Sequence, residues 1–161
     1  MTPAEPRPKR VVFNHVGLCV TDLDRSRQFY ESVLGFQYWW ELDAPDEGTS
    51  ALLRIPQPVG LHAVYLVRDG LVLELLHYRS SGTRAFRERV MNDPGLTHLS
   101  LAVGDIPGAL SQVAANGGTV VEETDITAAI MIRDPDGQLI ELTTTDWANS
   151  LPPRPDQPAP R

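Results

Sequence analysis

Two stretches of the chain carry the same pattern of apolar and polar residues. The first covers residues 15–23 and the second covers residues 98–106, and each begins with a histidine. The spacing of 83 residues between them persists as far as Gly35 and Gly118. A pattern that recurs at a fixed spacing indicates a duplicated structural unit. We therefore expect two copies of one module.

Within each stretch, aliphatic residues alternate with small or polar ones. Such an alternation with period two predicts a strand that buries one face. His15 and His98 fall on the opposite face, beside small residues such as Gly17 and Ser100, which leaves space next to each imidazole. The aliphatic faces comprise Val16, Leu18, Val20, Leu99, Leu101 and Val103.

A glutamate in an apolar stretch closes each copy of the repeat. Glu74 lies in Val-Leu-Glu-Leu and Glu141 lies in Leu-Ile-Glu-Leu, and each stretch follows a turn sequence that contains Arg-Asp and a glycine. The first copy is longer because of residues 42–58, which are rich in Asp, Glu and Pro. We interpret this segment as a loop insertion, the kind of place where functional variation concentrates.

A helix is predicted after each histidine strand. Asp22 or Asp24 can cap the first helix, and glycines end both helices. The order in each copy is then strand, helix and three strands. The expected strands are 11–20, 36–42, 50–55, 61–67, 71–77, 97–103, 119–123, 127–133 and 138–144, and the expected helices are 22–34, 84–91 and 106–116.

This order predicts an α+β fold of two tandem βαβββ modules. Helices would cover one face of each sheet, and the modules would form a curved sheet around a cleft. The expected organisation is a disordered arm at 1–10, module 1 at 11–80, a linker helix at 81–95, module 2 at 96–146 and a Pro-rich tail at 147–161.

Composition excludes several classes of protein. The formal charge of −7 and the pI near 5.0 argue against nucleic-acid binding, which needs a basic face. We expect the single cysteine, Cys19, to be buried in its strand, and it can form no intrachain disulfide. Neither a signal peptide nor a membrane-spanning run is found, so we expect a cytoplasmic protein without membrane association.

The two histidines and two glutamates form a candidate metal site. Taken alone, a histidine in an apolar strand is more often a hydrogen-bonded core residue than a metal ligand. A glutamate buried there without a partner lowers the stability of the fold. The repeat favours a ligand role, because His15, Glu74, His98 and Glu141 occupy matching positions on the cleft side. Such a set suits a divalent ion, Zn, Ni, Co, Fe or Mn, and would make this a metal-binding cleft.

Other chemistry-bearing residues lack a counterpart in the repeat. His77 differs in parity from Glu74 and should point away from it. Aromatic residues could line a substrate pocket and arginines could bind an anionic group, but we interpret both sets as packing and surface charge. These residues are Trp39, Trp40, Tyr65, Tyr78, Arg54, Arg84 and Arg87, with His62 also unmatched.

Over residues 11–146 the chain resembles the vicinal oxygen chelate superfamily, which includes glyoxalases, bleomycin-resistance proteins and dioxygenases. The scaffold hosts many chemistries, so the resemblance indicates the fold more closely than the reaction. The residues that carry it are His15 with Val20-Thr21-Asp22-Leu23, Phe29-Tyr30 with Leu34-Gly35-Phe36, Leu73-Glu74-Leu75, Thr97-His98-Leu99, and Asp134-Pro135-Asp136-Gly137 with Ile140-Glu141-Leu142.

The resemblance implies a metal-lined cleft, often completed across a homodimer, that acts on a small molecule. The His/Glu/His/Glu set is most similar to glyoxalase I, a lyase or isomerase that transfers a proton next to a substrate oxygen bound to the metal. Glu74 and Glu141 would then be the catalytic groups. Glyoxalase I proteins usually place an asparagine that contacts glutathione four residues after the first glutamate, where this chain has Tyr78.

Three alternatives within the superfamily compete with this interpretation. An acyl-CoA epimerase shares the cleft and the proton transfer, but usually has a glutamine where this chain has Glu74. An extradiol-type dioxygenase binds iron through two histidines and one glutamate, so a fourth ligand would crowd it. A non-catalytic drug-binding protein would not need the His/Glu set.

Overall fold

The structure is a computed structural model that describes residues 11–88 and 90–152. Its two halves each contain the predicted order of strand, helix and three strands, which confirms the two βαβββ modules. Module 1 comprises β1 (Val16–Cys19), α1 (Leu23–Ser32), β2 (Gln37–Asp43), α2 (Asp46–Leu53), β3 (Leu61–Arg68) and β4 (Leu71–Tyr78). Module 2 comprises β5 (Leu99–Val103), α3 (Ile106–Ala115), β6 (Thr119–Val121), the 3₁₀ helix η1 (Glu122–Thr124), β7 (Ala129–Arg133) and β8 (Leu139–Thr144), followed by α4 (Thr145–Ser150).

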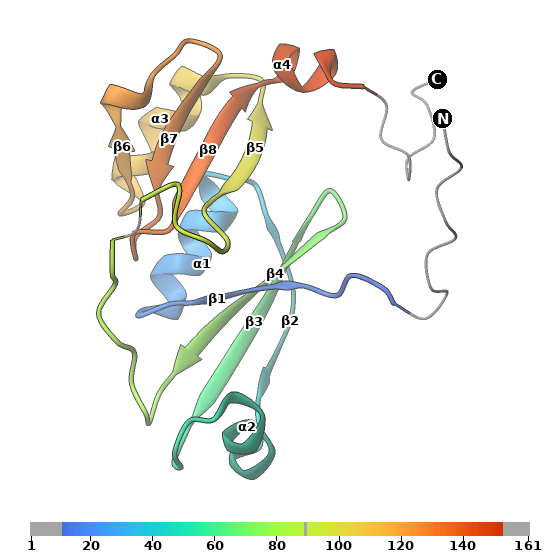
Figure 1. The fold of residues 1–161 in the computed structure, drawn as a ribbon, viewed down its shortest axis with the longest axis vertical. Coiled ribbons are helices and arrows are strands. Elements are labelled where there is room, and N and C mark those ends of the chain that lie inside the picture. Colours follow the sequence, from blue (N-terminus) through green and yellow to red (C-terminus); the bar gives the residue numbers. More distant parts are fainter. Residues whose placement is uncertain (1–10, 89, 153–161) are drawn as a thin grey trace.

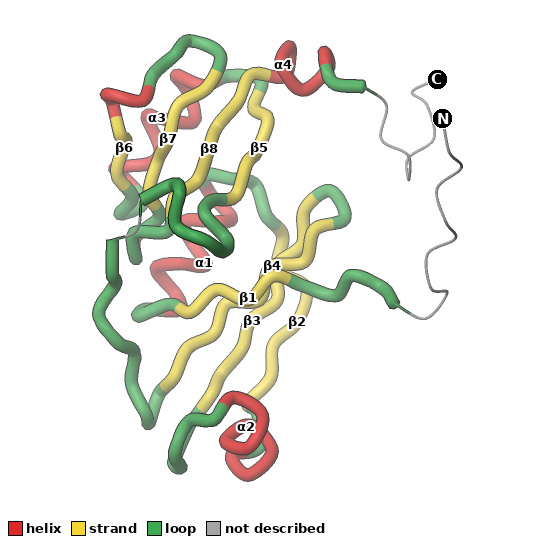
Figure 2. The backbone as a smooth tube through the Cα atoms, in the orientation of Figure 1, coloured by secondary structure: helices red, strands yellow, loops and turns green. Residues whose placement is uncertain are grey.

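The strands form two separate four-stranded sheets rather than one continuous sheet. Their orders are β1-β4-β3-β2 and β5-β8-β7-β6, and in each sheet the first strand runs parallel to the last strand of its module. Figure 1 shows the sheets at opposite ends of the molecule with α1 between them, and Figure 2 shows the strands of each sheet side by side. The modules are thus topologically equivalent, as the repeat predicts.

Matching caps begin the first helix of each module. The Asp22 carboxylate accepts a hydrogen bond from the Arg25 backbone N–H, and the Asp105 carboxylate accepts one from the Gly108 N–H. This contact satisfies a backbone donor that the first turn of a helix leaves unpaired. Past the end of the helices, Gly35 and Gly117 have φ of 68° and 81°, a conformation in which a side chain would be strained.

A single hydrophobic cluster joins the two modules. Phe29 and Tyr30 of α1 are fully buried in it together with Val113 of α3 and residues of both sheets, such as Leu73 and Ile140. Because burial of apolar surface is the main favourable term in folding, this shared core couples the modules energetically. The aliphatic strand faces predicted from the alternation lie against or within this core.

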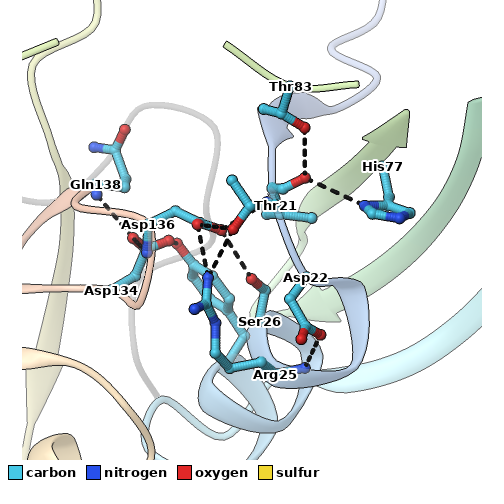
Figure 3. A network of polar contacts seen from close by, with 11 residues as sticks. Thr21, Asp22, Arg25, Ser26, His77, Thr83, Asp134, Asp136 and Gln138 are labelled. Carbon is cyan, nitrogen blue, oxygen red and sulfur yellow. Dashed lines mark hydrogen bonds and ion pairs between the residues drawn. The ribbon is translucent and has the colours of Figure 1, made fainter. Parts of the chain in front are cut away.

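A polar network fixes the contact between α1 and the turn that precedes β8 (Figure 3). The Tyr30 hydroxyl donates to the buried Asp134 carboxylate at 3.0 Å. Asp136, two residues on, accepts hydrogen bonds from the Thr21 N–H at 3.0 Å and the Arg25 guanidinium at 2.7 Å. Burial raises the pKa of Asp134, and the hydrogen bonds it accepts oppose that rise. These contacts set the orientation of one module relative to the other.

The insertion between β2 and β3 differs from the prediction. Residues 46–53 form α2, where a loop and a strand over residues 50–55 were expected. A short apolar run does not distinguish a strand from a helix, whereas Asp46 and Glu47 in the first turn favour a helix through its dipole.

The connection between the modules and the C-terminal segment also differ from the prediction. The described parts of the linker, residues 81–88 and 90–95, contain no helix, so the linker helix at 84–91 is wrong for these residues. Arg84, Phe86 and Arg87 are exposed there, and a helix of eight residues without a buried face is only marginally stable. The tail begins with α4 rather than irregular chain, because the Thr144 hydroxyl caps it by accepting from the Trp147 N–H.

Two expectations fall outside the described residues: the disordered arm at 1–10 and the end of the Pro-rich tail at 153–161. Among the helices that the structure describes, none combines the length and the apolar character needed to cross a membrane.

The hydrogen bond between the modules gives a direct test of this fold. Replacing Tyr30 with phenylalanine removes a donor from a buried carboxylate, so we expect Tyr30→Phe to lower the free energy of unfolding by about 1–3 kcal/mol in urea. Tyr38→Phe is the matched control, because Tyr38 is exposed on β2. Equal stability of the two variants would contradict the role given to this contact.

Candidate functional site

Module 1 holds a histidine–glutamate pair on the sheet face that α1 leaves open. The parallel register of β1 and β4 places Gly17 opposite Glu74, and His15 immediately precedes β1. The His15 Nε2 atom lies 2.9 Å from Glu74 Oε2. The side chain of Glu74 is only 11 % exposed, so this carboxylate depends on its partners for stabilisation.

Tyr65 is the second partner of Glu74. Its hydroxyl donates to Glu74 Oε1 at 2.5 Å, and Trp40 stacks on its ring with centroids 4.6 Å apart. The edge of the His15 ring also meets Tyr65, at 5.8 Å. Burial, followed by the hydrogen bond to Glu74, raises the pKa of Tyr65 well above its ordinary value, so its hydroxyl remains a donor at neutral pH.

The interpretation of Tyr65 as ordinary packing is therefore incomplete. Asp69 and Gly70 both have positive φ and connect β3 to β4 by a two-residue turn. Such a turn fixes the register of a hairpin, and counting back from it places Tyr65 opposite Glu74. The Asp-Gly pair was thus the sequence signal that could have identified Tyr65.

Module 2 holds the equivalent pair at the equivalent register. Ser100 of β5 lies opposite Glu141 of β8, as Gly17 lies opposite Glu74. The His98 Nε2 atom is 3.8 Å from Glu141 Oε2, and the Ser100 hydroxyl donates to the same oxygen at 2.6 Å. The Glu141 side chain is 28 % exposed, so it is less enclosed than Glu74.

The two pairs do not meet within one chain. Among residues 11–88 and 90–152, no three His, Cys, Asp or Glu side chains come close enough together to hold a metal ion. One chain therefore does not assemble the four expected ligands around a single cleft. It presents two half-sites instead, each with one imidazole nitrogen and at least one carboxylate oxygen directed to the same face of its sheet.

The donors of each half-site fit a borderline divalent cation. Imidazole nitrogen and carboxylate oxygen are ligands of Zn, Fe, Ni, Co and Mn sites. His98 Nδ1 lies 2.9 Å from the Thr97 hydroxyl, the kind of outer contact that orients a ligand imidazole. His15 Nδ1, in contrast, is buried and has no partner among the described residues.

Two pockets lie along the sheets that carry the His–Glu pairs, and only the smaller one is lined by a residue of a pair. The larger, of about 790 Å³, lies along the same sheet face as Glu74 and is lined by Cys19 and Tyr78, the α2–β3 connection and residues 80–84. The smaller, of about 350 Å³, includes Glu141 in an otherwise largely apolar wall that contains Ile130 and Met131. The expected burial of Cys19 is wrong, since its side chain is exposed to the larger pocket.

The remaining histidines lie on the other face of the first sheet. His62 pairs with His77 across β3 and β4, as its parity predicts. The His62 Nδ1 atom contacts the Asp43 carboxylate at 2.8 Å, and this hydrogen bond holds the pKa of Asp43 below its usual range. His77 Nδ1 lies 3.4 Å from the Val20 carbonyl (Figure 3). Neither histidine contributes to the half-sites.

Comparison with known proteins gives consistent matches. A family model described as the Glyoxalase/Bleomycin resistance protein/Dioxygenase superfamily matches residues 12–142. A probable lactoylglutathione lyase of Synechocystis is 31% identical over 137 residues, which cover 81% of this chain and 93% of that protein.

Solved structures show the same fold at lower identity. A glyoxalase family protein from Bacillus cereus has a TM-score of 0.73 at 21% identity, covering 88% of this chain and 98% of that one. The fosfomycin resistance protein FosX of Listeria monocytogenes, solved with Mn(II) and sulfate, has a TM-score of 0.57 at 17% identity, covering 83% and 91%. A divalent metal is thus bound by a protein of this fold.

The contact between Tyr65 and Glu74 can be tested by titration. In Glu74→Gln, the charge and the ionic hydrogen bond that raise the pKa of Tyr65 are lost while burial remains, so this pKa should fall but stay above its ordinary value. The measurement is the tyrosinate absorbance as a function of pH. For each protein, subtracting the curve of the same protein with Tyr65→Phe leaves the titration of Tyr65 alone. Glu123→Gln is the control and should leave the pKa of Tyr65 unchanged, since Glu123 is exposed on η1 in the other module and belongs to neither half-site. If the pKa of Tyr65 is the same in the native protein, in Glu74→Gln and in the control variant, the contact is refuted.

Proposed function

Because the chain belongs to the Glyoxalase/Bleomycin resistance protein/Dioxygenase superfamily, we propose that it is a metal-dependent lyase or isomerase of the glyoxalase I type. It would act on a small molecule by moving a proton at a carbon next to a substrate oxygen. The observation that carries this proposal is the pair of His–Glu half-sites at equivalent register in the two sheets. The 31% identity to a probable lactoylglutathione lyase supports the same reaction class.

We further propose that two copies of the chain complete each site. His15 and Glu74 of one copy would face His98 and Glu141 of the other, so that a homodimer holds two sites. The separation of the half-sites within one chain supports this arrangement. Exposed apolar side chains near the open faces add support, since large exposed apolar patches mark interaction surfaces. They include Val11, Val12, Phe13, Trp39 and Trp40 beside the first sheet and Trp147 and Leu151 beyond the second.

The bound divalent ion would supply a Lewis acid that polarises the substrate oxygen. The protein would supply the proton-transfer group. Glu74 is held by both His15 and Tyr65, which suits a fixed ligand. Glu141 is more exposed and is held by Ser100, and His98 lies farther from it. This difference favours Glu141 as the carboxylate that takes up and returns the proton, with Glu74 as the second candidate.

The pocket beside Glu141 suits the apolar part of the reacting end of a substrate. Its wall includes Val121, Ile126, Ile130 and Met131 next to the carboxylate. An apolar wall excludes water from the reacting carbon and strengthens electrostatic interactions at the carboxylate. This arrangement is what proton transfer from a weakly acidic carbon requires.

Elemental analysis together with an assay tests the proposed function. We expect about one divalent transition metal ion per chain in the purified or reconstituted protein. Isomerisation of the adduct of methylglyoxal with glutathione should be abolished by a chelator and restored by the metal. Glu141→Gln should lower kcat by about 100-fold or more, the usual contribution of a general base, whereas Glu123→Gln, on the exposed η1, should not.

Two results would contradict the proposal. One is the absence of bound metal even after reconstitution, which would leave a binding protein of the same fold. The other is bound iron with consumption of O₂, which would indicate a dioxygenase instead.

A further inference from the structure

Two histidines lie opposite each other on the first sheet, on the face that does not carry Glu74. The antiparallel register pairs His62 of β3 with His77 of β4. We propose that these two imidazoles form a second metal site, which binds an exchangeable divalent transition ion through both Nε2 atoms. This inference goes beyond the proposed function, because the site is on the other face of the sheet and needs neither half-site.

The hydrogen bonds of each ring leave its Nε2 atom available as a ligand. His62 Nδ1 lies 2.8 Å from the Asp43 carboxylate, and His77 Nδ1 lies 3.4 Å from the Val20 carbonyl oxygen (Figure 3). A carbonyl and an ionised carboxylate only accept hydrogen bonds, so each neutral imidazole carries its proton on Nδ1 and its lone pair on Nε2. The Glu41 Oε2 atom, 3.9 Å from His62 Nε2, is beyond hydrogen-bond distance.

The placement of the two side chains allows both imidazoles to reach one ion. Residues directly opposite each other on antiparallel strands have Cβ atoms about 4.5–5.5 Å apart. Both His62 and His77 line one pocket of about 420 Å³ at the start of α1, so both border the same space. The contacts at Nδ1 orient the rings in the way that outer contacts orient the imidazoles of metal sites. A bound ion would link β3 to β4 at the end of the hairpin remote from its turn.

The charge of this pocket favours a cation. Asp22 and Asp24 line it together with the two histidines. Arg79 also lines it, but its guanidinium is paired with the Asp43 carboxylate at 2.8 Å. Carboxylates that exceed the nearby cations create a negative potential, which raises the local concentration of positive ions. The pocket therefore attracts a divalent cation to the two Nε2 atoms rather than an anion.

The number of protein ligands determines what kind of ion binds and how firmly. In the part of the chain that the structure describes, no third His, Cys, Asp or Glu is placed to complete the site, so water or a small chelator fills the other positions. Imidazole nitrogen binds Zn, Ni and Cu, and a given site binds Cu²⁺ most tightly among the divalent ions of this row. Because two protein ligands hold an ion weakly, we expect desalting to remove it. It then does not contribute to the metal content of the purified protein.

A copper chelate with open coordination positions tests whether the two imidazoles act together. In Cu²⁺–iminodiacetate the chelator occupies only part of the coordination sphere, and imidazoles can fill the rest. We expect the metal-free protein to bind this chelate in a calorimetric titration. His62→Gln and His77→Gln should each lower the affinity at least about 10-fold, because the second imidazole acts at a high effective concentration once the first is bound. For the same reason the two losses should not add in the double variant. His98→Gln is the matched control, because it removes a partly exposed imidazole of the other module.

Unfolding in urea gives a second measurement that does not depend on turnover. Binding to the folded chain alone raises the urea midpoint, so the chelate should raise it in the native protein and in His98→Gln but not in the His62 or His77 variants. The same experiment without the chelate shows that each variant is folded. His77→Gln is the decisive variant, because it leaves the contact of His62 with Asp43 intact. Absence of binding to the native protein, unchanged affinity in folded His77→Gln, or loss of binding in His98→Gln would overturn the proposal.

Discussion

The buried carboxylate of Asp134 determines how the two modules sit against each other. It accepts hydrogen bonds from the Tyr30 hydroxyl and from the backbone N–H groups of Asp136 and Gln138, so the turn before β8 is anchored on α1. An unpaired carboxylate there would cost several kcal/mol, which makes this contact strongly directional. Because β8 begins just after the turn, the same contact fixes where Glu141 lies relative to module 1. The geometry of the site thus depends on a residue outside it.

The internal repeat was sufficient to predict the topology and the position of each His–Glu pair on one face of its sheet. Strand alternation placed His15 and Glu74 on one face of their sheet, and the structure confirms that face and its equivalent in module 2. The alternation of residues could not show whether the two half-sites lie close together. It gives only the face of a strand on which a side chain lies, whereas the distance between the half-sites depends on contacts between the modules, such as that of Tyr30 with Asp134. The helix α2, and the absence of a helix from the described parts of the linker, were missed because short segments of mixed polarity are decided by tertiary contacts. Tyr65 was within reach, since the Asp69-Gly70 turn sets its register.

Duplication with divergence has placed the two His–Glu pairs in different surroundings. In module 1 a tyrosine from the neighbouring strand holds Glu74, whereas in module 2 the position opposite Glu141 on β7 is Met131, and Ser100 holds the carboxylate instead. The result is one enclosed and one more accessible carboxylate. The pockets differ in the same way, apolar beside Glu141 and arginine-rich beyond Glu74.

The central claim is that each metal site is shared between two copies of the chain. It is tested most directly by co-expressing two differently tagged variants, His15→Ala/Glu74→Gln and His98→Ala/Glu141→Gln, and measuring metal in the purified mixed dimer. Each variant alone should bind no metal, because every site in its homodimer lacks one half. The mixed dimer should bind about one ion, since one of its sites combines two intact halves. A mixed dimer that contains no metal, while the native dimer does, would contradict the shared site.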